Sequence, residues 1–202
     1  MNWNDVSLRK WNEIETIFKG EYEDDILQTA DLIKVVFDIE DPMSMSPQEF
    51  QKYVHELEFI KTEIPQRKLL NVYTINGTKY YLNGNVYEMS MAALMDWRQY
   101  STKEDVDYAE CLSVFLIPQE HKYNDGYDIE KVVEDINSLP ITDALKIFSF
   151  FQVALQLSID IMTDYLQRLL KKTKMTKKQR MEIESKMKEA QEIWDSTYFR
   201  MH

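Results

Sequence analysis

Apolar residues return at every third or fourth position along most of this chain, the spacing that places them on one face of a helix. The first such stretch begins after Ser7, a helix-capping residue, and ends at Gly20. The third begins with Ser46, Pro47 and Glu49, which form a nearly complete capping box. These stretches predict helices over about residues 8–19, 22–37 and 47–60, with Phe18 and Ile26 among the buried residues.

The period changes in the stretch NVYTINGTKYYLNGNVY, residues 71–87, where strand-forming residues replace the helical pattern. The pair Asn76-Gly77 tolerates positive φ at both corners of a type I′ turn, so the sequence predicts a β-hairpin here. Residues 86–87 are predicted to add a short third strand. Because a hairpin is marginally stable alone, its tyrosines either pack against the helical body or leave an edge exposed for a strand of a neighbouring subunit. These tyrosines are Tyr73, Tyr80, Tyr81 and Tyr87.

Helical spacing resumes in the second half of the chain. Short helices are predicted over about residues 90–97, 103–115 and 128–137, and the segment IPQEHKYNDGYD is expected to form a loop. From about Thr142 to Leu170 apolar residues occupy more than one helical face, which predicts a long central helix. A final helix, over residues 176–198, is expected to fold back on it as an antiparallel hairpin.

The sequence therefore predicts a mainly α fold, a helical bundle with one small β-hairpin insertion and a C-terminal antiparallel helical hairpin. The chain has 202 residues and a net charge of −11. Residues 1–167 carry 14 basic and 30 acidic side chains, so they are expected to form an acidic body that repels nucleic acid and anionic membranes. Residues 168–202 carry ten basic and five acidic side chains. They are predicted to form a basic turn and a helix that packs back on the long helix.

Seven basic residues with no acid between them mark the turn between the last two predicted helices: Arg168, Lys171, Lys172, Lys174, Lys177, Lys178 and Arg180. Cations at the end of the long helix complement its dipole, which accounts for the first three. The last three open the next helix, where cations are disfavoured. We therefore consider this segment a candidate contact for an acidic protein surface or for nucleic acid. Protein is preferred, because the segment lacks the aromatic residues that stack on single-stranded bases.

No motif in the sequence indicates catalysis, a cofactor or a bound metal. The four glycines form none of the common phosphate-binding loops. The loop around Gly126 looks like a calcium loop, but His121 and Tyr123 stand where carboxylate ligands belong. His55 and Glu58 have a spacing used by di-iron sites, but no second histidine-bearing helix completes such a site.

The single cysteine, Cys111, lies in the apolar run CLSVFLI and is predicted to be a small core residue. One cysteine excludes an internal disulfide and favours a reducing compartment. The longest charge-free apolar run has 13 residues, whereas a bilayer crossing needs about 20, so we expect a buried core helix and no membrane span. From these features we predict a protein that is not an enzyme and holds no cofactor or metal.

Five phrases of the sequence resemble those of a family of proteins from crAss-like phages of gut bacteria and their relatives. They are WNDVSLRKWNEI, LEFIKTEIP, INGTKYYLN, LIPQEHKYNDGYD and LPITDALKIFSFF, within about residues 3–151. The opening phrase is also similar to that of small helical tail-assembly chaperones of phages. The resemblance implies a virion component or an assembly factor, and it carries no functional residues over to this chain.

We therefore expect a non-enzymatic bacteriophage protein that works through protein–protein contacts, as a head–tail connector or tail component or as a tail-assembly chaperone. Its expected partners are other phage structural proteins, in a homo-oligomer or a larger complex. It is expected in the host cytoplasm during assembly and, as a structural component, in the virion. The alternative is a nucleic-acid-associated or regulatory module that uses the basic segment 168–180. The residues predicted to contact a partner are the seven basic residues above with Tyr73, Tyr80 and Tyr81.

Overall fold

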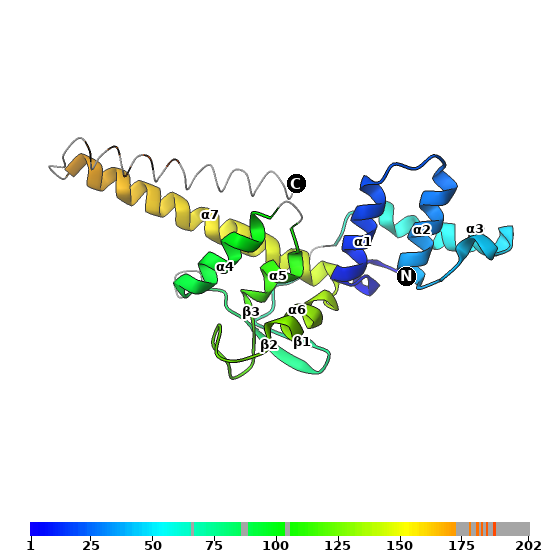
Figure 1. Cartoon of the computed structure of the whole chain (residues 1–202), viewed down its shortest axis with the longest axis horizontal. Helices are drawn as coiled ribbons and strands as arrows, with labels where there is room; N and C mark the ends of the chain where they lie inside the picture. Colours follow the sequence, from blue (N-terminus) through cyan, green and yellow to red (C-terminus); the bar gives the residue numbers. More distant parts are fainter. Residues whose placement is uncertain are drawn as a thin grey trace.

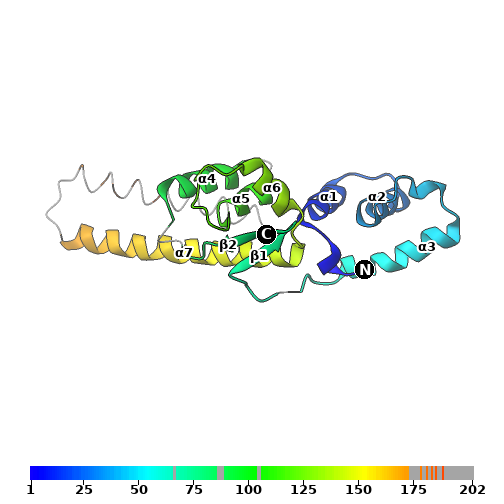
Figure 2. The same cartoon turned by 90° about the horizontal axis from the view of Figure 1, so that it is seen from below.

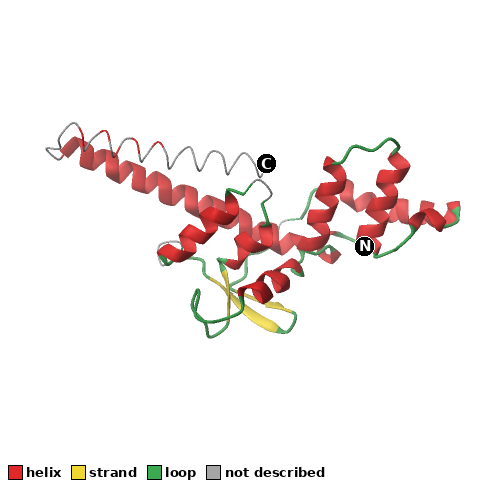
Figure 3. Ribbon diagram, viewed as in Figure 1, coloured by secondary structure: helices red, strands yellow, loops and turns green. Residues whose placement is uncertain are grey.

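The computed structural model describes residues 1–65, 67–85, 89–103 and 106–172, together with five single positions between 178 and 188. The fold is mainly α with a small three-stranded antiparallel sheet, which confirms the predicted class (Figure 3). The described part is elongated (Figures 1 and 2). Three N-terminal helices form one end, the sheet and three short helices lie in the middle, and the last helix runs from the middle to the other end.

Three helices build the N-terminal end: α1 (Leu8–Lys19), α2 (Asp25–Phe37) and α3 (Pro47–Glu56). The Ser7 hydroxyl caps α1, and Ser46 and Glu49 form the predicted capping box of α3. α2 begins three residues later than predicted, because Asp24 Oδ1 accepts a hydrogen bond from the Ile26 amide at 2.8 Å and caps the helix there. Local capping chemistry therefore sets where these helices begin.

Short 3₁₀ helices accompany these elements: η1 (Trp3–Asp5), η2 (Pro42–Ser44) and η3 (Leu57–Lys61). The sequence pattern predicts that the third helix continues to about Ile60, but α3 ends at Glu56 and the tighter turns of η3 complete the stretch. The expectation that Phe18 and Ile26 are buried is wrong, since their exposed fractions are 50% and 54%. Both lie near the loop that joins α1 to α2, where no described element covers them.

The small sheet contains β1 (Val72–Ile75), β2 (Thr78–Leu82) and β3 (Leu116–Pro118) in the order β1-β2-β3. Asn76 (φ 48°) and Gly77 (φ 81°) form the two-residue turn, so the predicted hairpin is confirmed. The third strand pairs Tyr81 with Ile117, in a part of the chain where the sequence pattern predicts the end of a helix and a loop. Residues 86–87, which were expected to supply that strand, lie outside the described residues.

Four further helices complete the fold: α4 (Met91–Ser101), α5 (Tyr108–Ser113), α6 (Ile129–Asn137) and α7 (Ile141–Lys172). α6 and α7 agree closely with the predicted helices, and α4 continues further than predicted. α5 is shorter than the predicted helix over 103–115. Asp107 caps it by accepting from the amides of Ala109 and Glu110, and the chain leaves the helix after Ser113 to enter β3.

The core lies where the first half of α7 meets α5 and the sheet. Phe151 of α7 stacks on Phe115 with ring centroids 3.6 Å apart, and Phe148 meets Tyr108 edge to face at 5.5 Å. The second half of α7 extends past α4 in both views (Figures 1 and 2). None of the described helices is long and apolar enough to cross a membrane.

The predicted final helix, residues 176–198, lies outside the described residues apart from five single helical positions. Four of these positions are exposed and Ile183 is half-buried. The antiparallel hairpin with α7 and the division of the chain at residue 168 therefore stay predictions.

Candidate interaction site

A buried hydrogen-bond cluster fastens the hairpin to α6. Tyr80 of β2 is 1% exposed, and its hydroxyl donates to Asp135 Oδ2 of α6 at 2.6 Å. The side-chain amide of Asn76, in the hairpin turn, donates to Asp135 Oδ1 at 2.9 Å. Asp135 is itself buried, so protein donors take the place of water at both of its oxygens. Burial, together with the hydrogen bond to Asp135, raises the pKa of Tyr80 and keeps its hydroxyl protonated as a donor.

The loop between β3 and α6 is held in shape at both of its ends. The Gln119 amide donates to the Lys79 carbonyl at 2.8 Å and ties the start of the loop to β2. At the other end, Asp128 Oδ1 caps α6 by accepting from two amides of its first turn, at 3.0 and 3.2 Å. Three residues of the loop have positive φ between 59° and 75°: Glu120, Asn124 and Gly126. The predicted loop is therefore confirmed over residues 119–128.

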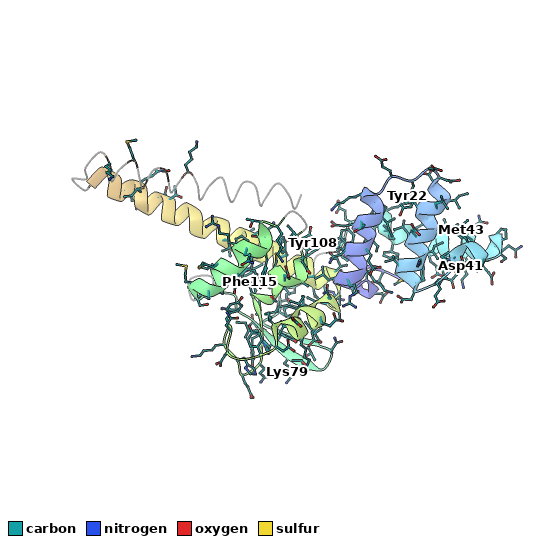
Figure 4. All side chains as sticks on the ribbon, in the orientation of Figure 1. Tyr22, Asp41, Met43, Lys79, Tyr108 and Phe115 are labelled. Carbon is teal, nitrogen blue, oxygen red and sulfur yellow. The ribbon has the colours of Figure 1, made fainter. Side chains whose placement is uncertain are left out.

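An open cavity of about 540 Å³ lies between β2, this loop and the start of α6. Its most buried lining residues are Tyr80 and Val132. The rings of His121 and Tyr127 meet edge to face in its wall, with centroids 5.7 Å apart. Figure 4 marks Lys79, another lining residue, on the side of the molecule where the sheet and α6 lie, away from α1 to α3.

The exposed polar side chains around this cavity are mainly hydrogen-bond donors, and we call it the donor cavity. Lys79, Lys131 and His121 are exposed in its lining. Within the described part of the chain, neither lysine ammonium makes an ion pair or a hydrogen bond. Asp128 is the one carboxyl group among the lining residues, and its Oδ1 is already engaged by the amides of α6. Burial raises the pKa of Tyr127, so this phenol also stays protonated.

The three tyrosines predicted to contact a partner have different environments. Tyr73 is 4% exposed and Tyr80 is 1% exposed, whereas Tyr81 is 46% exposed on the outer face of the sheet. The Tyr73 hydroxyl accepts a hydrogen bond from the Leu70 amide at 3.0 Å, and burial raises the pKa of Tyr73. Tyr73 and Tyr80 therefore brace the hairpin against the helical body and are not available to a partner of the folded chain. Of the three, Tyr81 alone stays a candidate contact.

The structure describes only part of the basic segment, and three of its residues lie at the C-terminal end of α7. Arg168 is exposed on the second half of α7, and Lys171 and Lys172 are its last two residues. Lys178 is exposed at a single described position. The other three predicted residues lie outside the described residues: Lys174, Lys177 and Arg180.

The residues considered for chemistry have structural environments. Cys111 is fully buried, and burial raises its pKa to about 12, so its thiol is inert at neutral pH. His55 Nδ1 lies 3.2 Å from Glu58 Oε1, and both side chains are exposed. In the described ranges no group of three or more histidine, cysteine, aspartate or glutamate side chains is arranged to hold a metal ion.

The five phrases quoted in the sequence analysis meet at two places in the structure. The first is a buried joint at the start of α7. There the Trp3 indole donates to the Thr62 carbonyl at 3.1 Å and packs edge to face on Phe59. The Ile141 amide donates to the Val6 carbonyl at 2.8 Å in the same joint. The second place is the donor cavity, whose lining comes largely from INGTKYYLN and LIPQEHKYNDGYD. The buried joint is therefore structural, whereas the donor cavity faces solvent.

Sequence reasoning missed the donor cavity, because Lys79, His121 and Lys131 carry no motif and become neighbours only when β3 pairs with β2. The phrases INGTKYYLN and LIPQEHKYNDGYD supply most of the lining, but nothing in either phrase indicates that the two segments meet. Comparison of the chain with protein families, curated proteins and solved structures gives no match. The resemblance to phage proteins therefore stays a prediction.

Proposed function

We propose that this protein takes part in the assembly of bacteriophage particles by binding other phage proteins, without catalysing a reaction. It is either a connector or tail component that stays in the particle or a tail-assembly chaperone that leaves it. The donor cavity carries the proposal, because its two exposed lysines face solvent and form no ion pair or hydrogen bond within the described residues. Exposed, unneutralised donors of this kind give specificity and fast association in protein recognition.

The extended shape of the described part of the chain also supports a binding role. The second half of α7 projects past the described core (Figures 1 and 2), and Asp164, Gln167 and Arg168 on it are exposed. A projecting helix can lie along a partner over many residues, which is a common mode of protein recognition.

Mass spectrometry of purified phage particles separates the two versions of this proposal. A connector or tail component is expected in mature particles at a fixed ratio to the other structural proteins, whereas a chaperone is expected only in infected cells, bound to a tail protein. Light scattering coupled to size-exclusion chromatography is expected to show an oligomer or a stable complex with that protein. A strict monomer that is missing from particles and binds no phage protein contradicts both versions.

The second candidate function is nucleic-acid binding through the basic segment 168–180. The exposure of Arg168 and Lys178 favours it, because phosphate contacts need accessible cations. In this case affinity for a DNA oligonucleotide falls steeply with salt and collapses in the variant Lys177→Glu/Lys178→Glu/Arg180→Glu. Binding that is insensitive to both changes contradicts this function.

A further inference from the structure

We propose that the donor cavity binds an acidic segment of a partner protein through the carboxylates of that segment. The inference rests on the proposed function, because it names the kind of segment that a phage partner would insert at this site. The cavity lies between β2, the loop that follows β3 and the start of α6, and it is distinct from the basic segment 168–180.

The chemistry of the free groups selects an anionic ligand. Lys79 and Lys131 bring two ammonium groups that form no ion pair with a described carboxylate, and the Gln119 side chain adds an amide donor at the exposed rim. The His121 ring Nδ1 is already within 3.4 Å of the Asp125 carbonyl. The carboxyl group of Asp128 offsets one positive charge, and its Oδ1 is turned to the amides of α6. A ligand that brings acceptors and a small negative charge therefore completes the site, whereas a cationic or donor-rich ligand meets unpaired donors.

The size of the cavity limits how much of a partner enters it. A volume of about 540 Å³ falls in the range of roughly 300–1,000 Å³ that holds a small ligand or a few side chains. Its lining is mixed, since the half-buried Pro118 and Tyr127 supply apolar surface beside the exposed polar side chains. A short peptide segment with carboxylates spaced around an apolar residue matches this arrangement.

The charge of the surrounding body favours an acidic peptide over nucleic acid. Residues 1–167 carry 14 basic and 30 acidic side chains, so the surface around the cavity repels a long polyanion. Duplex DNA brings a negative charge about every 1.7 Å along its axis and extends far beyond a cavity of this size. A peptide segment instead places its few carboxylates at the two lysines and keeps its remaining length free of charge.

Fluorescence anisotropy with the full chain tests the proposal. The probe is a fluorescein-labelled peptide in which two glutamates flank a leucine and the other residues are uncharged, used at low salt. The other ligands are the same peptide with glutamines in place of the glutamates and a single-stranded oligonucleotide of similar length. The test variant is Lys79→Glu/Lys131→Glu, and the neutral variant Lys79→Gln/Lys131→Gln serves if charge reversal impairs folding. The matched control is Lys34→Glu/Lys52→Glu, which changes the net charge equally at two exposed lysines of α2 and α3.

We expect the glutamate peptide to bind and the glutamine peptide not to bind. Affinity for the glutamate peptide falls at least about tenfold in the Lys79/Lys131 charge reversal and about threefold in the neutral variant, because two attractive pairs are lost or reversed. The Lys34/Lys52 control changes the affinity by less than about twofold, since distant exposed charges are largely screened. Circular dichroism and thermal unfolding confirm that each variant used is folded.

Three results overturn the proposal: no binding of the glutamate peptide, equal loss in the test and control variants, or tighter binding of the oligonucleotide with loss in the Lys79/Lys131 variants. The last result assigns the cavity to nucleic acid. The proposed function is tested separately by co-purification with phage proteins. If phage proteins still co-purify while the peptide does not bind, only the assignment of the donor cavity fails.

Discussion

Replacing Tyr80 with phenylalanine tests the cluster that builds the donor cavity. The substitution removes one hydroxyl and leaves the ring, which is 1% exposed, in place. Asp135 Oδ2 then loses its donor at 2.6 Å, while Oδ1 keeps the Asn76 amide at 2.9 Å. A buried carboxyl oxygen is left without a protein donor, and one of the two side-chain hydrogen bonds to Asp135 is lost.

The magnitude of the effect follows from burial and from the chemistry of the acceptor. A hydrogen bond to a charged group contributes about 1.5–3 kcal/mol, and a buried acceptor left without a donor costs about 1–3 kcal/mol. The first figure counts the lost bond and the second counts the unsatisfied oxygen that remains, so the two are not added. We therefore expect Tyr80→Phe to lower the free energy of unfolding by about 2–3 kcal/mol. For a chain of this length that corresponds to a fall in Tm of about 4–12 °C.

Urea unfolding followed by circular dichroism measures this loss, and Tyr81→Phe is the matched control. Tyr81 is the next residue of β2, is 46% exposed, and its hydroxyl makes no hydrogen bond within the described residues. Its substitution is expected to change stability by less than about 0.5 kcal/mol. A double-mutant cycle with Asp135→Ala then isolates the coupling between Tyr80 and Asp135. If Tyr80→Phe is as mild as Tyr81→Phe, the cluster does not hold the hairpin to α6 and the reasoning is refuted.

Three further predictions concern the fold. Burial raises the pKa of Cys111 from 9.0 to about 12 and that of Tyr108 from 10.0 to about 12, so the folded state holds these protons more tightly than the unfolded state. The stability that these protonated groups contribute is complete below pH 9 and is lost as the pH rises from 9 to 12. The free energy of unfolding in urea should therefore decline over this range. In Cys111→Ala only Tyr108 of the two groups remains, so the decline should begin nearer pH 10. Gly77→Ala should destabilise the folded chain by about 1 kcal/mol in thermal unfolding, because Gly77 has a φ of +81°, which alanine adopts only with strain. The site has open space for a methyl group, so a neutral result contradicts the turn geometry. Trp3→Ala should cost about 3–5 kcal/mol in urea unfolding, since Trp3 is 4% exposed and packs against Trp11 at 5.4 Å, and a loss below about 1 kcal/mol contradicts the buried joint.

Elements with local signals were predictable from the sequence. The capping box at Ser46 and Glu49 and the turn at Asn76-Gly77 each involve residues a few positions apart, so the sequence contains all that determines them. The long apolar pattern of α7 likewise requires no partner to be recognised. These features decide the fold class, which the structure confirms.

Features that depend on pairing of distant segments were not predictable. β3 lies at the end of an apolar run whose spacing also suits a helix, and only its pairing with β2 makes it a strand. The bond between Tyr80 and Asp135 joins residues 55 positions apart, so the tyrosine side chain gives no sign that it is a brace rather than a surface contact. The donor cavity depends on both of these contacts, which is why Lys79 and Lys131 were not recognised as a pair.

Co-purification from infected cells tests the central claim most directly, namely that this chain works by binding other phage proteins. The full chain, carrying an affinity tag, is purified from cells in which its phage replicates, and both the eluate and the purified particles are quantified by mass spectrometry. The account predicts an identified phage structural protein in a fixed ratio to the chain in at least one of the two samples. Recovery of the chain alone from infected cells, together with its absence from particles, contradicts the account.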